Sequence, residues 1–333
     1  MTTYPVGIIG CGDFLRRQAP VIRSSSRIKV ARLFDLDKKR AGHFADLFTG
    51  EPADSAEEIL SDPSIPIVFI FTPPWARREL AVRAAGEGKH IVMAKPLAAH
   101  ADDADAILEA VRGRVNCAVF YRRTGNPFYE TLRRIFASGE IGRLSLYKED
   151  WLHHYPVWNS WATDPERNRG PFMDAMIHTL NIARYLMEGE VSSLCFFSQN
   201  YAQKLDCVDT EFLKVDFSSG GSAYLFISWA ANLEIYDTAG NEREFILNCH
   251  MVTDQGWYVS EGRREDRPVV QARNEKSLLT WPFLDLQATA YDGFVEALEA
   301  GSPQPFHVED AWRDVRILEQ AMAGANKMIR VKL

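Results

Sequence analysis

The chain has 333 residues, a formal net charge of −7 and a charged fraction of 25%, a length that allows two domains with separate cores. Its acidic balance argues against a general nucleic-acid binder, which usually carries a basic patch. No apolar run approaches the roughly 18 residues that cross a bilayer, and the first residues lack the zones of a signal peptide. We therefore expect a cytoplasmic protein with neither a nucleic-acid nor a membrane partner.

The cysteine and histidine patterns favour neither a disulfide framework nor a metal site. The five cysteines are scattered, and none forms a CxxC pair, so buried free thiols are the simplest interpretation. His153 and His154 are adjacent, which would direct them to opposite sides of a strand and make them a poor metal pair. We expect no bound metal.

The first domain, residues 1–121, alternates short apolar runs with amphipathic segments. The expected strands are residues 6–9, 28–34, 65–71, 90–93 and 116–120, and the expected helices are residues 13–24, 38–48, 76–87 and 101–111. Nearly continuous apolar strands separated by helices are typical of a parallel sheet covered on both faces. With right-handed crossovers, this pattern predicts a doubly wound α/β domain.

The second domain, residues 122–333, has a different rhythm. We expect a helix at 126–138, strands that include 212–217, 223–229 and 244–248, a hairpin turn at 218–221, and late helices at 285–300 and 308–325. Long strands with few crossovers predict an α+β domain with a large, mostly antiparallel sheet. One face of that sheet would pack on helices, which leaves the other for a second subunit.

A glycine-rich turn follows the first expected strand. Gly10 and Gly12 are placed to let backbone amides at Asp13, Phe14 and Leu15 face a pyrophosphate at the start of the next helix. Leu15 occupies the third fingerprint position, where Gly or Ala is usual, so an ordinary strand–helix turn is the alternative interpretation.

Residues later in the domain favour the nucleotide interpretation. Asp35 ends the second strand, where a carboxylate accepts hydrogen bonds from a ribose diol and repels a 2′-phosphate. This favours NAD as the cofactor, with NADP as the alternative. Thr72, Pro73 and Pro74 follow the expected strand at residues 65–71, at the ligand-binding edge, and their rigid backbone suits a cofactor wall as well as it suits a structural turn.

Three residues form a candidate catalytic group. Asp174 and His178 lie four residues apart, a spacing that places both side chains on one helix face. Lys95, before Pro96 in a distant turn, would add positive charge. Beside a dinucleotide, such a group predicts proton transfer coupled to hydride transfer. Taken singly, each residue has a simpler interpretation. His178 could be a helix histidine with its hydrogen bonds satisfied, Asp174 an acid on the helix surface, and Lys95 a solvated turn residue.

An aromatic segment precedes the Asp174 and His178 helix. Its members are Trp151, His153, His154, Tyr155, Trp158 and Trp161. Flat aromatic faces suit the C–H faces of a sugar ring, so this segment could cover a substrate cleft. Packing in a core or at a subunit interface is the alternative.

Together these landmarks resemble the glucose–fructose oxidoreductase / inositol dehydrogenase family, usually written Gfo/Idh/MocA. The similarity covers essentially the whole chain and includes Gly10-Cys11-Gly12, Asp35, Thr72-Pro73, Lys95-Pro96, Ser138 to Gly142, Trp161, Gly170, Asp174 and His178. The resemblance implies a Rossmann domain, a mostly antiparallel second domain, and homodimers or homotetramers formed through its sheet. It also implies NAD(P)-dependent oxidation or reduction of sugars, cyclitols and related polyols.

By resemblance, Lys95 contacts the reacting hydroxyl, His178 is the general acid/base, and Asp174 contacts substrate or orients the imidazole. Trp161 and Asn181 would contact the substrate as well. The chain departs from the family pattern at Leu15, Pro74, Arg77, Ala94, Met176 and Asn181. Two alternatives therefore stay open: an enzyme that keeps NAD bound as an internal redox relay, and a non-catalytic dinucleotide-binding regulatory protein.

Overall fold

The computed structural model describes residues 2–156, 161–233, 246–286 and 288–326, and they form two compact units. The first unit contains residues 1–125 and 286–315, and the second contains residues 126–285 and 316–333. Each unit is considered by itself below. No helix in the described ranges is both long and apolar enough to cross a membrane.

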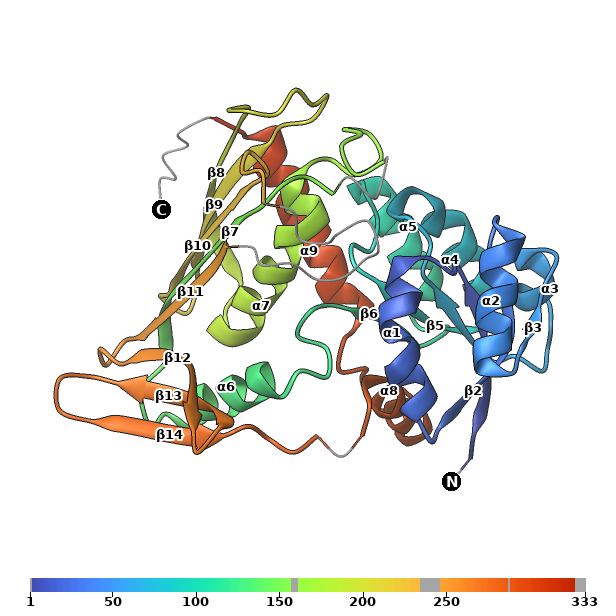
Figure 1. The fold of residues 1–333 in the computed structure, drawn as a ribbon, viewed down its shortest axis with the longest axis horizontal. Coiled ribbons are helices and arrows are strands. Elements are labelled where there is room, and N and C mark those ends of the chain that lie inside the picture. Colours follow the sequence, from blue (N-terminus) through green and yellow to red (C-terminus); the bar gives the residue numbers. More distant parts are fainter. Residues whose placement is uncertain (1, 157–160, 234–245, 287, 327–333) are drawn as a thin grey trace. The chain divides into compact units, whose positions relative to one another are not determined.

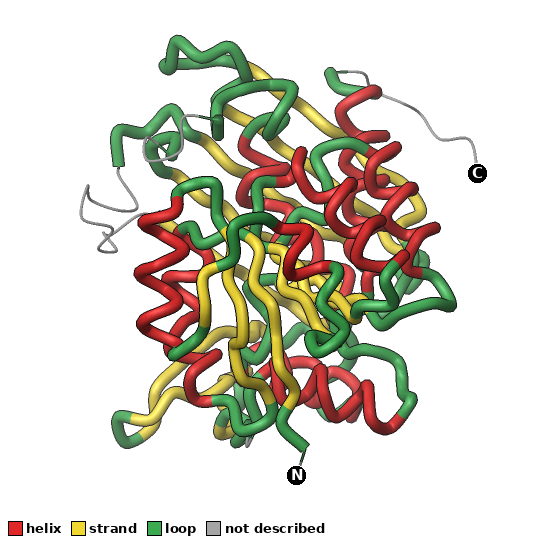
Figure 2. The backbone as a smooth tube through the Cα atoms, turned by 90° about the vertical axis from the view of Figure 1, so that its right-hand side faces the viewer, coloured by secondary structure: helices red, strands yellow, loops and turns green. Residues whose placement is uncertain are grey.

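The first unit is built on a six-stranded parallel sheet with the order β3-β2-β1-β4-β5-β6. Figure 2 looks onto this unit, whose strands run side by side between helices. Its strands are β1 (Tyr4–Ile9), β2 (Ile28–Phe34), β3 (Glu51–Pro52), β4 (Ile67–Ile70), β5 (His90–Ala94) and β6 (Cys117–Phe120). Its helices are α1 (Asp13–Ser24), α2 (Lys38–Phe48), α3 (Ala56–Leu60), the short 3₁₀ helix η1 (Pro74–Ala76), α4 (Arg77–Gly86), α5 (Ala101–Val111) and α8 (Ala290–Ala300). This is the predicted doubly wound fold.

Helix α8 belongs to the core of the first unit, although the sequence analysis placed it in the second domain. Tyr291, Phe294 and Val295 are buried in one hydrophobic cluster with Phe69 of β4 and Phe120 of β6. After this helix the chain adds a backbone pairing at the sheet edge, because the amide of residue 119 donates to the carbonyl of residue 306 at 2.9 Å. These segments lie far apart in the sequence, so the sequence alone does not indicate that they pack together.

The start of α8 also differs from the prediction. The helix begins at Ala290 rather than at residue 285, because Thr289 and Asp292 form a reciprocal capping box. The Thr289 hydroxyl accepts from the Asp292 amide at 3.1 Å, and the Asp292 carboxylate accepts from the Thr289 amide at 3.1 Å. Satisfying the first free amides in this way fixes where the helix begins.

The second unit contains an eight-stranded sheet with the order β14-β13-β12-β11-β7-β10-β9-β8 (Figure 1). Its strands are β7 (Leu144–Leu152), β8 (Val191–Gln199), β9 (Thr210–Phe217), β10 (Ser222–Ser228), β11 (Ile246–Thr253), β12 (Tyr258–Arg264), β13 (Arg267–Arg273) and β14 (Leu278–Pro282). All neighbours pair antiparallel except β7 and β10, which are parallel. The large, mostly antiparallel sheet is therefore confirmed. The expected strand at 244–248 begins at Ile246 in β11, and residues 244 and 245 lie outside the described ranges.

Helices cover one face of this sheet. They are α6 (Pro127–Ser138), the π-helical segment η2 (Phe172–Met176), α7 (Ile177–Met187) and the last part of α9 (Val308–Ala323), whose earlier residues belong to the first unit. Alternate residues of the central strands, such as Ala223, Leu225 and Ile227 of β10, are fully buried beneath them. The predicted turn at residues 218–221 joins β9 to β10, which pair antiparallel from Asp216 and Ser222 onward.

Candidate active site

The order of strands in the first unit reverses between β1 and β4, and the chain segments that follow these strands come very close together. Gly10 has φ +101°, and a Cβ built on it would lie 2.7 Å from the carbonyl carbon of Phe71 and 2.8 Å from the amide nitrogen of Thr72. Any side chain at Gly10 would therefore collide with backbone. Ligands of doubly wound folds bind at this point of strand reversal.

The N-terminus of α1 is open toward this edge. Gly12 is the N-cap residue, and no side chain in the described ranges caps the helix there. A Cβ at Gly12 would meet nothing within 4 Å, so the backbone there is accessible to a ligand. The amides of Asp13, Phe14 and Leu15 precede the first intrahelical donor, Arg16, which donates to the Gly12 carbonyl at 3.1 Å. Free amides and the helix dipole at such an end attract an anion.

The side chains of Phe14 and Leu15 pack against other apolar residues of the first unit. Leu15 has no exposed surface and lies in the hydrophobic core of the first unit. The Phe14 ring packs edge-on against Phe71 with ring centroids 4.8 Å apart. Leu15 therefore leaves the space at Gly12 free, and its departure from the usual glycine fingerprint reflects core packing.

Asp35 is bound to the glycine turn through its carboxylate. One oxygen accepts from the Cys11 amide at 2.7 Å, and the other accepts from the Asp37 amide at 2.8 Å. A carboxylate oxygen can accept more than one hydrogen bond, so both keep capacity for a ribose diol. Two nearby cations are paired elsewhere. The Lys38 ammonium group donates to Asp54 at 2.8 Å, and Nε of Arg40 lies 3.4 Å from a carboxylate oxygen of Asp37.

Thr72 is one of the residues of the first unit with a buried polar atom that lacks a described partner. Its hydroxyl oxygen is buried and has no hydrogen-bond partner among the described residues, although buried polar atoms are normally paired. It immediately follows the backbone against which Gly10 packs. Together with the uncapped α1 terminus and Asp35, this orphaned hydroxyl fits a bound dinucleotide.

Arg77, which sequence reasoning treated only as a departure from the family pattern, is buried at 4% exposure in the first unit. Its Nε donates to the Thr72 carbonyl at 2.9 Å, and its Nη1 donates to the carbonyls of Ala94 at 2.5 Å and Pro96. Burial lowers the pKa of its guanidinium from the ordinary value, which still leaves the group charged at neutral pH. Arg77 thus joins the turn after β4 to the turn after β5.

Lys95 lies half-buried between the two carbonyls that Arg77 binds. Its amide donates to the Phe120 carbonyl at 3.1 Å, and the Lys95–Pro96 peptide is cis. The residues that follow, Pro96 to Ala99, are all buried. Lys95 is therefore the accessible residue of a turn that is otherwise packed into the unit.

In the second unit, Asp174 lies in the π-helical segment η2 and His178 in the first turn of α7. From residue 171 to residue 183, these two are the half-buried positions and every other residue is buried. The two side chains thus share the accessible side of one continuous helical segment. A π-helical turn replaces the regular α-helix that the four-residue spacing predicted, and such turns are frequent at functional sites.

Glu211 of β9 holds the start of this segment. Its carboxylate accepts from the Phe172 amide at 2.6 Å, and a Cβ on Gly170 would lie 3.4 Å from one of its oxygens. Burial raises the pKa of Glu211 to about 8, against the opposing effects of the Phe172 amide and Arg169. Sequence reasoning missed Glu211 because 39 residues separate it from Phe172.

Asp174 acts electrostatically on two buried neighbours. Burial lowers the pKa of His153, and a hydrogen bond with the His154 carbonyl and the charge of Asp174 oppose that shift. Burial raises the pKa of Cys207 to about 12, with smaller contributions from Glu211 and Asp174. The half-buried Asp174 carboxylate therefore lies within electrostatic reach of a neutral imidazole and an unreactive thiol.

The aromatic segment divides between core and surface. Trp151 is buried in the sheet, where its indole donates to Glu149 at 2.6 Å and the Tyr147 hydroxyl donates to the same carboxylate. His153 is also buried, whereas His154, Tyr155 and Trp161 are half-buried. Trp158 lies outside the described residues. Packing is thus the role of Trp151, and Trp161 stays a predicted substrate contact. Asn181, also predicted to contact substrate, is 2% exposed.

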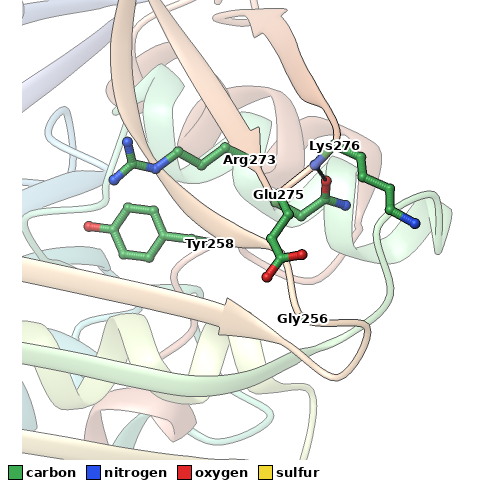
Figure 3. A pocket seen from close by; sticks show the side chains of 6 residues that line it. Gly256, Tyr258, Arg273, Glu275 and Lys276 are labelled. Carbon is green, nitrogen blue, oxygen red and sulfur yellow. Dashed lines mark hydrogen bonds between the residues drawn. The ribbon is translucent and has the colours of Figure 1, made fainter.

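The described residues contain a surface pocket away from the predicted site residues, and no cluster suited to a metal ion. No group of three or more His, Cys, Asp or Glu residues in the described ranges could hold a metal ion. A surface pocket of the second unit lies where β11 turns to β12 and β13 to β14, and Arg273 there covers the ring of Tyr258 (Figure 3). Figure 3 shows Glu275 and Lys276 beside them, and none of the predicted site residues lines this pocket.

Comparison with known protein families gives two matches, which together cover most of the chain. Residues 4–121 match the oxidoreductase family with an NAD-binding Rossmann fold, and residues 129–247 match the GFO/IDH/MocA C-terminal domain. The chain belongs to the Gfo/Idh/MocA family. It is an NAD(P)-dependent oxidoreductase of that family, which argues against a purely regulatory dinucleotide-binding protein.

Individual relatives within the Gfo/Idh/MocA family are distant. The uncharacterized oxidoreductase YrbE of Bacillus subtilis is 27% identical over 71% of this chain and 72% of its own. The scyllo-inositol 2-dehydrogenase (NAD(+)) of the same species is 29% identical, over 50% of this chain and 49% of its own. A crystal structure of aldose-aldose oxidoreductase from Caulobacter crescentus with glycerol superposes with a TM-score of 0.83 at 17% identity, covering 99% of this chain and 100% of that one. That likeness shows the shared fold.

The raised pKa of Glu211 predicts a pH dependence of stability. From its ordinary pKa near 4.5 up to about pH 8, the folded protein keeps a proton that the unfolded chain loses. The free energy of unfolding should therefore fall as the pH rises through this range, by at most about 1.4 kcal/mol per pH unit for one proton. Glu211→Gln, whose amide oxygen can still accept from Phe172, should flatten this slope in urea unfolding followed by circular dichroism.

The exposed Glu140 offers the matched control, because Glu140→Gln changes the same charge at a solvated position. This variant should keep the slope of the unaltered protein. An unchanged slope in Glu211→Gln would show that Glu211 is not the group that carries the dependence.

Proposed function

We propose that this oxidoreductase transfers hydride between a nicotinamide dinucleotide and a hydroxyl-bearing carbon of a sugar, cyclitol or related polyol. The observation that carries the proposal is the accessible pair Asp174 and His178, a carboxylate and an imidazole in a segment that is otherwise buried. The names of the relatives, an inositol dehydrogenase and an aldose-aldose oxidoreductase, support the substrate class.

The cofactor residues all belong to the first unit. The amides at the start of α1 would hold the pyrophosphate, and Asp35 would accept hydrogen bonds from the ribose diol. The Thr72 hydroxyl would form a hydrogen bond with a further polar atom of the cofactor. Pro73, Pro74 and Pro96 would form rigid walls. The bound dinucleotide supplies the hydride acceptor or donor, and the protein orients it.

His178 would accept the hydroxyl proton of the substrate during oxidation and return it during reduction. An imidazole has an ordinary pKa of about 6.5, so near neutral pH it is available in the basic form. The Asp174 carboxylate, from the same accessible side of the segment, would orient the imidazole or bind a neighbouring hydroxyl. A positioned acid/base group of this kind contributes roughly 10²- to 10⁴-fold to the rate.

Lys95 would stabilise the negative charge that develops on the substrate oxygen. An ammonium group favours the alkoxide during oxidation, and in reduction it polarises the carbonyl. Trp161 would supply an apolar face to the sugar ring, and Asn181 would contact the substrate or support the neighbouring His178. These residues come from both units, so a functional test must show that they act on one reaction.

A double-mutant cycle provides that test. His178→Ala and Lys95→Met should each lower kcat/KM for the best polyol by about 10²-fold or more, with NADH appearance as the readout. The double variant should lose much less than the product of the single losses, because the effects of residues that act as a unit on one transition state are not additive. NADH affinity in His178→Ala should stay within about threefold of the unaltered protein.

The outcomes separate the proposal from its rivals. Full activity in His178→Ala would remove the histidine from the mechanism, and strictly multiplicative losses would show that the two residues contribute independently and do not act as a unit. Substrate conversion without net NADH appearance would instead indicate a bound cofactor that is oxidised and reduced within each cycle.

The carboxylate of Asp35 predicts a preference for NAD over NADP. Its negative charge would repel a 2′-phosphate. Asp35→Asn keeps an acceptor for the Cys11 amide but removes the charge, so the ratio of NAD to NADP specificity should fall about tenfold or more. Fluorescence titration with NADH and NADPH measures the two dissociation constants. An unchanged ratio would assign the cofactor preference to other residues.

We also propose that the protein forms a homodimer or homotetramer through the sheet of the second unit. Helices α6 and α7 lie on one side of this sheet in Figure 1. Tyr224 and Phe226 alternate with the buried residues of β10, and Phe212 pairs with Phe226, so these three side chains belong to the opposite face. Some charges on that face are paired within the sheet, as in Lys148 with Asp150 at 2.6 Å and Lys214 with Asp216 at 2.6 Å. An apolar sheet face with internally paired charges can be buried against a second copy.

Phe226→Lys should dissociate the assembly, because it places an unpaired charge in the centre of the interface. Size-exclusion chromatography with light scattering should show a larger species for the unaltered protein and a smaller one for the variant. Glu140→Lys, at an exposed site, should leave the mass unchanged. A monomeric unaltered protein would contradict the proposal.

A further inference from the structure

Arg77 binds the backbone on both sides of Lys95. The carbonyls of Ala94 and Pro96 both accept from its Nη1, and its Nε donates to the Thr72 carbonyl at 2.9 Å. We propose that Arg77 is a positioning residue, which fixes Lys95 relative to the Thr72 turn and thereby aligns the lysine for the reaction. This inference rests on the proposed function of Lys95.

The arrangement uses the particular shape of a guanidinium group. Its donors lie in one plane and point in fixed directions, so Nε and Nη1 can serve two different turns at once. A lysine in the same place would offer a single ammonium group on a flexible stem. A glutamine would offer one amide nitrogen and no charge, so neither substitute can reproduce all three contacts.

The surroundings of Arg77 indicate that these hydrogen bonds compensate the burial of its positive charge. Arg77 is 4% exposed, and each hydrogen bond that the structure gives its side chain goes to a backbone carbonyl of the two turns. Burial of a cation costs free energy unless polar groups compensate it. The carbonyl dipoles beside Lys95 provide that compensation, so the two turns and the guanidinium hold one another in place.

Its neighbour Arg78 supplies a matched comparison. Arg78 is 54% exposed at its side chain and pairs with Asp103 at 3.1 Å on the surface of the first unit. It touches neither of the two turns through any contact that the described residues show. The two adjacent arginines therefore separate the loss of a positive charge from the loss of the link between the turns.

The test compares Arg77→Lys and Arg77→Ala with Arg78→Ala in the full-length protein. At saturating NAD and polyol, kcat should fall about 10- to 100-fold in Arg77→Ala, since a shift of about 1 Å at a reacting group costs up to 10²-fold. The KM for the polyol should change less than about threefold. Arg77→Lys should recover part of the loss, and guanidinium at sub-denaturing concentration should partly restore Arg77→Ala. Arg78→Ala should match the unaltered protein.

A lower melting temperature with unchanged kcat in the folded Arg77 variants would overturn the inference, because it would assign Arg77 to stability alone. A second readout is independent of turnover. Hydrogen exchange at the Lys95 amide and at residues 97–99 should accelerate in Arg77→Lys and not in Arg78→Ala. Equal exchange in both variants would overturn the inference, whether or not any polyol is turned over. A complete absence of polyol turnover would instead count against the proposed function.

Discussion

The contact between Gly10 and the backbone of Phe71 and Thr72 determines much of the first unit. It lets β1 and β4 lie side by side and still brings the segments beyond them together, at the place where the strand order reverses. Three features lie within a few residues of this contact along the chain: the N-terminus of α1, the orphaned Thr72 hydroxyl and Arg77. A side chain at Gly10 would force these segments apart, and with them the groups that can hold a dinucleotide.

Much of this arrangement could be predicted from the sequence because its signals are local. Apolar runs such as residues 67–70 predict buried parallel strands, and the Ser218 to Gly221 cluster predicts the hairpin that is found. The spacing of Asp174 and His178 predicts a shared helix face, and they are the accessible positions of their segment. Leu15 departs from the glycine fingerprint without closing the turn, because its side chain enters the core.

Features that depend on distant partners could not be predicted. In the sequence, Arg77 is marked only as a departure from the family pattern, and the carbonyls of Thr72, Ala94 and Pro96 explain its burial. Glu211 is an ordinary strand residue in sequence, and its role depends on the Phe172 amide. The π-helical turn leaves no mark on the apolar pattern, because nearly every residue from 171 to 183 is buried and no polar face reveals the number of residues per turn.

Helix α8 has a consequence for synthesis of the protein. The first unit draws on residues from both the beginning and the later part of the chain, with Phe69 and Phe120 packed against Tyr291. A ribosome must therefore make residues 126–285 of the second unit before the last aromatic side chains of this core exist. Until then the nascent nucleotide-binding unit presents an apolar surface that chaperones can recognise, and a chain cut short after β14 would keep that surface permanently.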